Sequence, residues 1–300
     1  MNLRTTSDLQ WTLGGGAFNV CGRTVGRLPA GAYTPFLDNC GESHFKPHQL
    51  HTDDLIEFPE SVSARVLDEV ERFWSMGQRF ARFGFAHRRG YLFYGKQGCG
   101  KSSLIHQIIS RIVGAGHVAF FCNSYPHGMA TALGRFREVE PERPVVCVFE
   151  DIDAIIEHYG DSELLQLLDG NAQVNRVVNV ASTNYPEKLD RRIIARPRRF
   201  DRLIKIGSPD AGLRQAFFAK KMPEMPAALL ARWVELSAGL PFAALTELII
   251  SVECLGNELE ESARMLHELD KATPSSDQLG SGDGNDGGGG NASDDIDIPF

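Results

Sequence analysis

One segment limits what this chain can fold into more than any other, the string GKQGCGKS at residues 95–102. It follows the pattern G-x-x-x-x-G-K-S, in which glycines let backbone N–H groups turn inward around phosphate oxygens. The apolar run at 91–94 predicts a buried strand before the string, and residues 102–109 predict a helix after it. The N-terminus of that helix adds a dipole that favours anions. An incidental glycine turn lacks this context, so the string predicts a nucleotide-binding phosphate loop.

The loop also predicts how ATP and Mg²⁺ are held. Lys101 can reach the β- and γ-phosphates, and the Ser102 hydroxyl can bind Mg²⁺. We expect the nucleotide to contact a continuous set of residues: Gly95, Lys96, Gln97, Gly98, Cys99, Gly100, Lys101, Ser102 and Ser103.

A second part of the site is expected where another strand ends. The apolar run at 145–149 leads directly into Glu150 and Asp151, some fifty positions after the phosphate loop. Carboxylates there can hold the metal's water shell and polarise a water that attacks the γ-phosphate. An acidic strand end is common by itself, but its pairing with a phosphate loop predicts a hydrolytic site.

The pattern of apolar runs predicts an α/β fold with a five-stranded parallel sheet covered on both faces. The runs lie at 91–95, 118–123, 145–151, 177–183 and 202–207, with helical patterns between them. We divide the chain into an N-terminal segment of unknown role (1–53), an α/β nucleotide-binding domain (54–209), a small helical bundle (210–272) and a tail (273–300) rich in Gly and Asp. The tail composition cannot bury enough apolar area to fold alone, so we expect it to be disordered.

From about 54 to 256 the chain resembles an AAA+ ATPase of the AAA branch. The resemblance rests on the phosphate loop, the acidic strand end, and four strings: LLDG at 167–170, TNYP at 183–186, LD at 189–190 and RPRRFD at 196–201. It implies that Asn184 is the polar sensor that orients the attacking water, and that residues 210–272 are the family's lid. It also implies that Arg196 and Arg199 are arginine fingers that reach the nucleotide of the adjacent subunit of a homo-oligomeric ring, typically a hexamer. A solvated basic turn is the alternative for these arginines.

Two departures from the family pattern affect the chemistry. Most AAA proteins have Asp-Glu where this chain has Glu150-Asp151, and the reversed order resembles the branch that contains the mitochondrial Rieske-protein translocase. We assign Glu150 to the metal and Asp151 to the water, although Asp is one methylene shorter than Glu. The other departure is Arg198 in place of a glycine, which leaves both finger positions intact.

Two further groups of residues permit more than one interpretation. Tyr125 follows the second strand, where AAA motors place an aromatic loop that grips substrate, but a surface turn explains a Tyr-Pro dipeptide as well. Cys40, His44, His48 and His51 lie within twelve positions and include good zinc ligands. Their spacing fits no standard zinc pattern, and polar loop residues account for them equally.

The C-terminal residues carry a separate signal. After Lys271 there is no Lys or Arg, and the chain ends in Asp297, Ile298, Pro299 and Phe300 after a glycine-rich stretch. This tip resembles that of bacterial single-stranded-DNA-binding proteins, which implies docking to proteins with a pocket for it, through an aromatic anchor and flanking charge. An acidic solubilising tail is the alternative, and the tip can equally fold back on its own ring as an inhibitor.

These features predict an ATP-driven motor that remodels a macromolecule in bacterial or phage DNA replication or repair. Two alternatives stay open, an ATP-gated scaffold that recruits replication proteins and a protein-directed chaperone or translocase with no role on DNA. The chain lacks about 20 consecutive apolar residues and a signal-peptide core, which favours the cytoplasm and no membrane partner. The formal charge of −8 gives no strongly basic nucleic-acid surface, though a local basic patch is compatible with it.

Overall fold

The fold is taken from a computed structural model, which describes residues 10–14, 17–22, 24–50, 56, 58, 61–122, 126–169, 175–194 and 199–272. Its centre is a seven-stranded sheet with the order β4-β3-β6-β7-β8-β5-β9. All neighbours in it are parallel except β3 and β4. The seven strands are β3 (Gly31–Leu37), β4 (Ser43–Pro47), β5 (Arg88–Tyr94), β6 (Val118–Phe121), β7 (Val145–Phe149), β8 (Val177–Thr183) and β9 (Arg202–Lys205). A separate two-stranded antiparallel sheet consists of β1 (Gln10–Gly14) and β2 (Ala17–Cys21).

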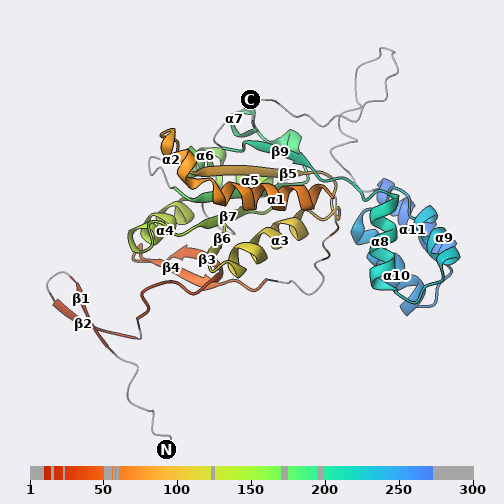
Figure 1. The fold of residues 1–300 in the computed structure, drawn as a ribbon, viewed down its shortest axis with the longest axis horizontal. Helices are drawn as coiled ribbons and strands as arrows, with labels where there is room; N and C mark the ends of the chain where they lie inside the picture. Colours follow the sequence, from red (N-terminus) through yellow and green to blue (C-terminus); the bar gives the residue numbers. More distant parts are fainter. Residues whose placement is uncertain are drawn as a thin grey trace, which may run out of the picture.

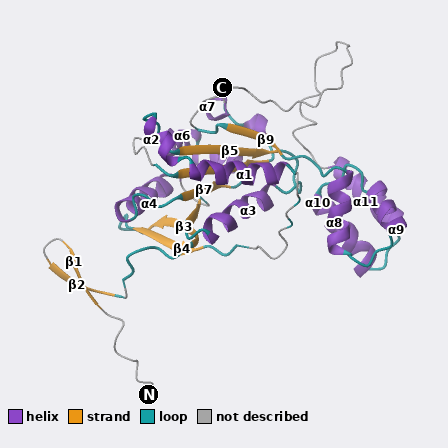
Figure 2. Cartoon of the chain, in the orientation of Figure 1, coloured by secondary structure: helices purple, strands orange, loops and turns teal. Residues whose placement is uncertain are grey.

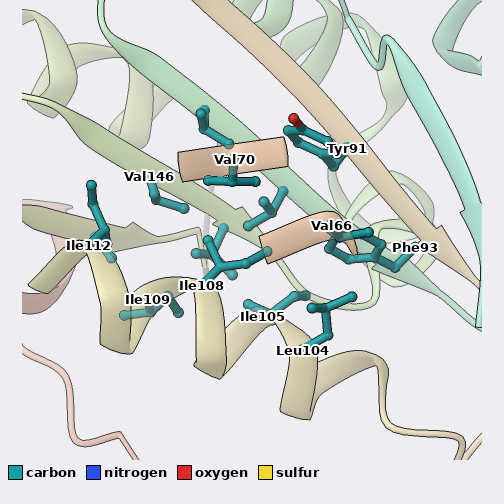
Figure 3. Close-up of a cluster of buried hydrophobic side chains, with 14 of the residues drawn as sticks. Val66, Val70, Tyr91, Phe93, Leu104, Ile105, Ile108, Ile109, Ile112 and Val146 are labelled. Atoms are coloured by element: carbon teal, nitrogen blue, oxygen red, sulfur yellow. The ribbon is translucent and has the colours of Figure 1, made fainter. Parts of the chain in front are cut away.

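Helices cover both faces of the sheet, as expected for parallel strands (Figure 2). They are α1 (Val62–Ser75), α2 (Gly77–Arg82), α3 (Lys101–Gly114), α4 (Pro126–Val139), α5 (Ile152–Tyr159), α6 (Asp161–Asp169) and α7 (Arg191–Ile194), with a 3₁₀ turn at Pro186–Lys188. Side chains alternate between the faces along each strand, so Tyr91 and Phe93 pack against α1 and α3 (Figure 3), whereas Leu92 packs with the α4–α6 layer. This packing places the C-terminal ends of β5, β7 and β8 together at one edge.

The α/β fold of the prediction is confirmed, but the sheet has seven strands rather than five. The additional strands, β3 and β4, come from the segment to which we assigned no role. Only Gly31, Ala32 and Tyr33 of β3 pair with β6, so Pro35 lies where β3 has β4 as its single neighbour. Because Pro cannot donate a ladder hydrogen bond, it weakens a strand pattern in sequence and is tolerated at such a position.

Four helices follow the sheet: α8 (Ala211–Lys221), α9 (Ala227–Leu236), α10 (Phe242–Ile249) and α11 (Leu259–Ala272), with a π-helical turn at Ile250–Cys254. They lie within the span 210–272, for which we predicted a small helical bundle. Their own core surrounds Trp233, Phe218 and Leu245. Figure 1 shows this helical group at one end of the sheet and α2 at the other. The predicted tail lies outside the described residues, and the division points at 53, 209 and 272 stay predictions.

Among the described residues, no helix is both long enough and apolar enough to cross a membrane.

Candidate functional site

The phosphate loop connects β5 to α3 at the C-terminal edge of the sheet. Strand β5 ends at Tyr94, and α3 begins at Lys101, so the helix N-terminus points at the loop. Gly95 has a φ of +138°, and a Cβ built there lies 2.3 Å from the Ile206 carbonyl oxygen. Any larger residue collides with the β9 end, which explains why the loop begins with glycine.

Lys101 is the central cation of this loop. It is buried, and its Nζ donates to the backbone oxygens of Gly95 at 2.7 Å and Lys96 at 2.9 Å. Burial lowers the pKa of the Lys101 ammonium. Ser102 and Ser103 begin the helix with exposed side chains. The loop therefore presents a cation and two hydroxyls to the same space.

The acidic strand end lies across from the loop. Asp151 follows β7 with a φ of +46°, a left-handed conformation that is uncommon for a residue other than glycine. Its Oδ1 accepts a hydrogen bond from Asn184 Nδ2 at 3.3 Å, and its N–H donates to Ser182 Oγ at 3.3 Å. Burial raises the pKa of the Asp151 carboxyl, and the nearby Asp153 and Glu150 raise it further. The predicted water-polarising residue and the predicted sensor are thus in direct contact.

Asp153 supports this arrangement from two positions further along, in the first turn of α5. Its Oδ1 accepts a hydrogen bond of 2.6 Å from Thr183 Oγ1, which in turn accepts from the Tyr185 N–H at 2.9 Å. Thr183 is fully buried and immediately precedes Asn184. The two bonds fix the backbone on either side of Asn184.

These groups line one cavity of about 470 Å³, which also reaches into the helical group. Its apolar end is formed by residues that the sequence reasoning missed: Ile56, Phe58, Phe217 and Phe242. The Phe58 and Phe242 rings stack with centroids 5.5 Å apart and planes 12° apart, and Gln107 Nε2 donates to the Ile56 oxygen at 3.0 Å. An apolar end opposite cations and carboxylates fits a nucleotide, with the base among the rings and the phosphates at the loop.

The helical group contacts the loop directly. Lys96 Nζ forms an ion pair with Asp270 Oδ2 of α11 at 2.6 Å, and the Ala243 N–H donates to the Gly98 oxygen at 3.2 Å. Lys96 therefore faces α11 here, whereas Gln97 through Ser103 line the nucleotide cavity. Glu150 is partly exposed and is not among the described residues that line the cavity.

Of the two arginines assigned as fingers, Arg199 lies among the described residues. Arg199 is 3% exposed, and its guanidinium donates to the backbone oxygen of Arg192 in its own chain. This inward placement does not present the side chain to a neighbour, and its role across a subunit interface stays a prediction. Arg196, Tyr125 and the tip residues 297–300 lie outside the described residues.

The Cys and His residues near the N-terminus have other contacts. His44 Nε2 lies 3.0 Å from Asp38 Oδ2, and His48 Nδ1 lies 3.0 Å from Thr34 Oγ1 while its ring stacks on Phe121. Within the described part of the chain, which does not include His51, no three metal-ligating side chains gather at one point. His44 lies in strand β4 rather than in a loop and His48 directly follows that strand, and both rings have partners within the chain.

Comparison with known proteins agrees with this geometry. Residues 91–208 match the family model described as "ATPase family associated with various cellular activities (AAA)". The chain is 28% identical over 184 residues to "ATPase family gene 2 protein homolog A" of Homo sapiens, covering 56% of this chain and 20% of the relative. It is 30% identical over 212 residues to "Cell division cycle protein 48 homolog" of Archaeoglobus fulgidus, covering 64% and 28%. It is 27% identical over 231 residues to "ATP-dependent zinc metalloprotease FtsH 2" of Symbiobacterium thermophilum, covering 69% and 38%.

The chain thus spans less than two fifths of the length of each of these relatives. The matched region begins in β5 and ends just beyond β9, so it contains the phosphate loop, the acidic strand end and Asn184. Taken with the cavity that these residues line, the match identifies residues 91–208 as an AAA ATPase domain.

Proposed function

We propose that this protein is an ATP-hydrolysing motor that remodels a macromolecule as a homo-oligomeric ring. The observation that carries the proposal is the convergence of Lys101, Asp151 and Asn184 on one cavity. Phosphoryl transfer depends on positioning and on charge stabilisation, and these three side chains provide a fixed cation, a base and an orienting amide.

The chemistry divides among this chain's own residues. Lys101 stabilises negative charge on the β- and γ-phosphates. Ser102 with Glu150 would hold Mg²⁺, which would supply further positive charge beside the phosphates. Asp151 accepts a proton from the attacking water, and Asn184 orients that water through its amide. Asn184 already donates to Asp151, so the two groups can share one water between them. Arg196 of a neighbouring subunit would complete the site in a ring of six, and Arg199 would have to leave its buried position in its own chain to join it.

The biological setting is also part of the proposal. We place the motor in the cytoplasm of a bacterial or phage-infected cell, in DNA replication or repair. Tyr125 would grip the substrate in the ring's central pore. The tip at residues 297–300 would recruit proteins that have a pocket for the end of a single-strand-binding protein. The acidic run before the tip supports this role through charge that aids capture.

The hydrolytic part is tested with Asp151→Asn. The change keeps the shape of the side chain and removes the base, so we expect ATP binding close to that of the wild type and turnover lower by about 10²-fold or more. Equilibrium binding of a fluorescent ATP analogue and release of inorganic phosphate measure the two quantities. Lys101→Ala, which removes the phosphate-binding cation, is the control that loses binding.

A result in which Asp151→Asn hydrolyses ATP at the wild-type rate would remove Asp151 from this role. Wild-type turnover that is slow and unaffected by any added substrate, together with ATP-dependent assembly, would favour a scaffold over a motor. Stimulation by a protein substrate but not by DNA would favour a protein-directed translocase.

A further inference from the structure

The chain has a net negative charge, but residues 72–137 contain no Asp or Glu. No Asp or Glu occurs between Glu71 and Glu138, although the whole chain has 39 of them and a formal charge of −8. The first part of this span includes α2 and the turn that leads into β5. Its basic residues are not needed by the nucleotide site, which lies at the other end of β5.

Four residues form what we call the aromatic surface. Arg79 and Arg82 belong to α2, and Phe83 and Phe85 belong to the turn that follows it. Phe83 is 67% exposed and Phe85 58% exposed, so two large apolar rings face solvent within three positions. The rings are 26° from parallel, with centroids 6.5 Å apart, and the Arg82 guanidinium lies 5.9 Å from the Phe83 centroid. Water-facing rings of this kind indicate an interaction site.

The backbone holds these rings in a defined position. The Phe83 N–H donates to the Arg79 oxygen, and the Phe85 N–H donates to the Phe80 oxygen at 3.0 Å. Phe80 itself is half-buried and packs edge-on against Phe73 of α1, at 5.5 Å. The turn is therefore anchored to the core, and the two exposed rings are presented without a large loss of conformational freedom on binding.

The charge around the rings is positive and uncompensated. Arg79 and Arg82 are exposed on the last turn of α2, three positions apart and on one face. Neither forms an ion pair with any residue in the described part of the chain, in contrast to Arg111, Arg135 and Arg232. The helix dipole alone explains cations at the C-terminal end of α2, but it does not explain two exposed aromatic rings beside them.

We infer that the aromatic surface binds single-stranded nucleic acid, with bases stacked on Phe83 and Phe85 and phosphates paired with Arg79 and Arg82. Sequence-independent strand binding combines these two kinds of contact, since every base has an aromatic face and every nucleotide a negative charge. An apolar protein surface would instead leave both guanidinium groups desolvated. The chain's own acidic tail, residues 273–300, fits this surface less well, because it has one aromatic ring, Phe300, whereas the surface exposes two rings.

The position of the surface suits a substrate contact that does not disturb the nucleotide. It precedes the N-terminal end of β5, and the phosphate loop follows the C-terminal end of this seven-residue strand. The two sites are thus separated by roughly 20 Å of strand. Figure 1 shows α2 at the end of the sheet opposite the helical group. Two arginines give a weak single contact, which several copies in a ring would strengthen through avidity.

The inference deepens the proposed function, since it rests on that function for the role of the bound nucleic acid as the motor's substrate. The test is fluorescence anisotropy with a labelled, mixed-sequence DNA oligonucleotide of about 20 nucleotides, long enough for one or more binding modules. It is carried out on the full chain at several salt concentrations. ATP turnover is measured separately on each protein.

We expect the double variant Phe83→Ser with Phe85→Ser to weaken oligonucleotide binding by at least about tenfold, because stacking contributes strongly per base. The double variant Arg79→Gln with Arg82→Gln should reduce the slope of log K against log salt by about 1.4, the value for two phosphate contacts on a single strand. Leu255→Ser and Lys220→Gln, exposed changes in the helical group, are matched controls that should leave binding unchanged. All four proteins should keep wild-type basal ATP turnover and melting temperature.

Binding that is insensitive to both double variants would overturn the inference. It would also be overturned if a peptide of residues 277–300 displaced the oligonucleotide, bound more tightly and depended on the same two rings, because the surface would then belong to the chain's own acidic segment. ATP hydrolysis without oligonucleotide binding would contradict the inference but not the proposed ATPase function. Oligonucleotide binding without ATP hydrolysis would contradict the proposed ATPase function but not the binding site.

Discussion

At the level of single residues, Gly90 has a role that its size alone explains. Its N–H donates to Asp201 Oδ2 at 2.9 Å, and its oxygen accepts from the Asp201 N–H at 2.9 Å. A Cβ built on Gly90 lies 1.9 Å from the Arg199 oxygen and 2.9 Å from the Phe200 Cα, so a larger residue must displace backbone atoms. Gly90 thus lets the segment that carries Arg199 pack directly on β5.

Gly90→Ala is therefore expected to lower the free energy of unfolding by about 2–3 kcal/mol, the scale of overpacking in a core. Gly134→Ala is the matched control, because Gly134 lies in the interior of α4 and a Cβ there has no atom within 4 Å. It should raise the free energy by about 0.5–1 kcal/mol. Urea unfolding of the three proteins measures both changes, and a similar effect of the two variants would contradict this account.

At the level of elements, His87 connects α1 and α2 to the sheet through packing and a hydrogen bond. It lies directly before β5, packs on the Phe73 ring at 4.2 Å and the Phe80 ring at 4.9 Å, and its Nε2 hydrogen-bonds to the Phe73 oxygen at 2.9 Å. Its Nδ1 is buried without a partner. Burial lowers the pKa of His87, because the protonated ring would lose its hydration and its second N–H would have no acceptor.

A lowered pKa in the folded state makes the unfolded chain the better proton acceptor. His87 therefore reduces stability as pH falls below the ordinary histidine value of about 6.5, and it has no such effect at higher pH. We expect His87→Gln, which keeps an N–H donor but does not titrate, to lose less of its melting temperature than the wild type between about pH 7 and pH 5. Parallel losses in both proteins would show that His87 does not contribute to this acid sensitivity.

Element by element, the sequence predicts those parts of the site that are continuous strings. The phosphate loop, the acidic end of β7 and Asn184 each follow a strand, and the parallel sheet brings strand ends to one edge. The stacked Phe58 and Phe242 could not be predicted in this way, since they come from distant segments and meet only when the helical group packs on the cavity. Strand β3 was missed because Pro35 interrupts its pattern.

At the level of the whole molecule, the helical group is positioned by the nucleotide site itself. The Lys96–Asp270 ion pair and the Ala243–Gly98 hydrogen bond both end on the phosphate loop. Phe217, Phe242 and Thr246 of the same group line the cavity. A nucleotide in the cavity therefore contacts both parts of the chain, so its binding and hydrolysis can change how they pack. This coupling is what a motor that moves a substrate requires.

The proposed ring makes a separate prediction, because the proposed arginine finger would belong to one subunit and the site it completes to the next. A subunit with Arg196→Ala keeps its own site but supplies no finger, whereas a subunit with Asp151→Asn supplies a finger but cannot hydrolyse ATP. Each variant alone should be nearly inactive. Mixed in equal amounts and allowed to reassemble, they should recover about a quarter of wild-type turnover, since about a quarter of the head-to-tail interfaces then pair an intact site with an intact finger. Phosphate release measures the recovery, and a mixture no more active than its components would mean that Arg196 acts within its own subunit or not at all.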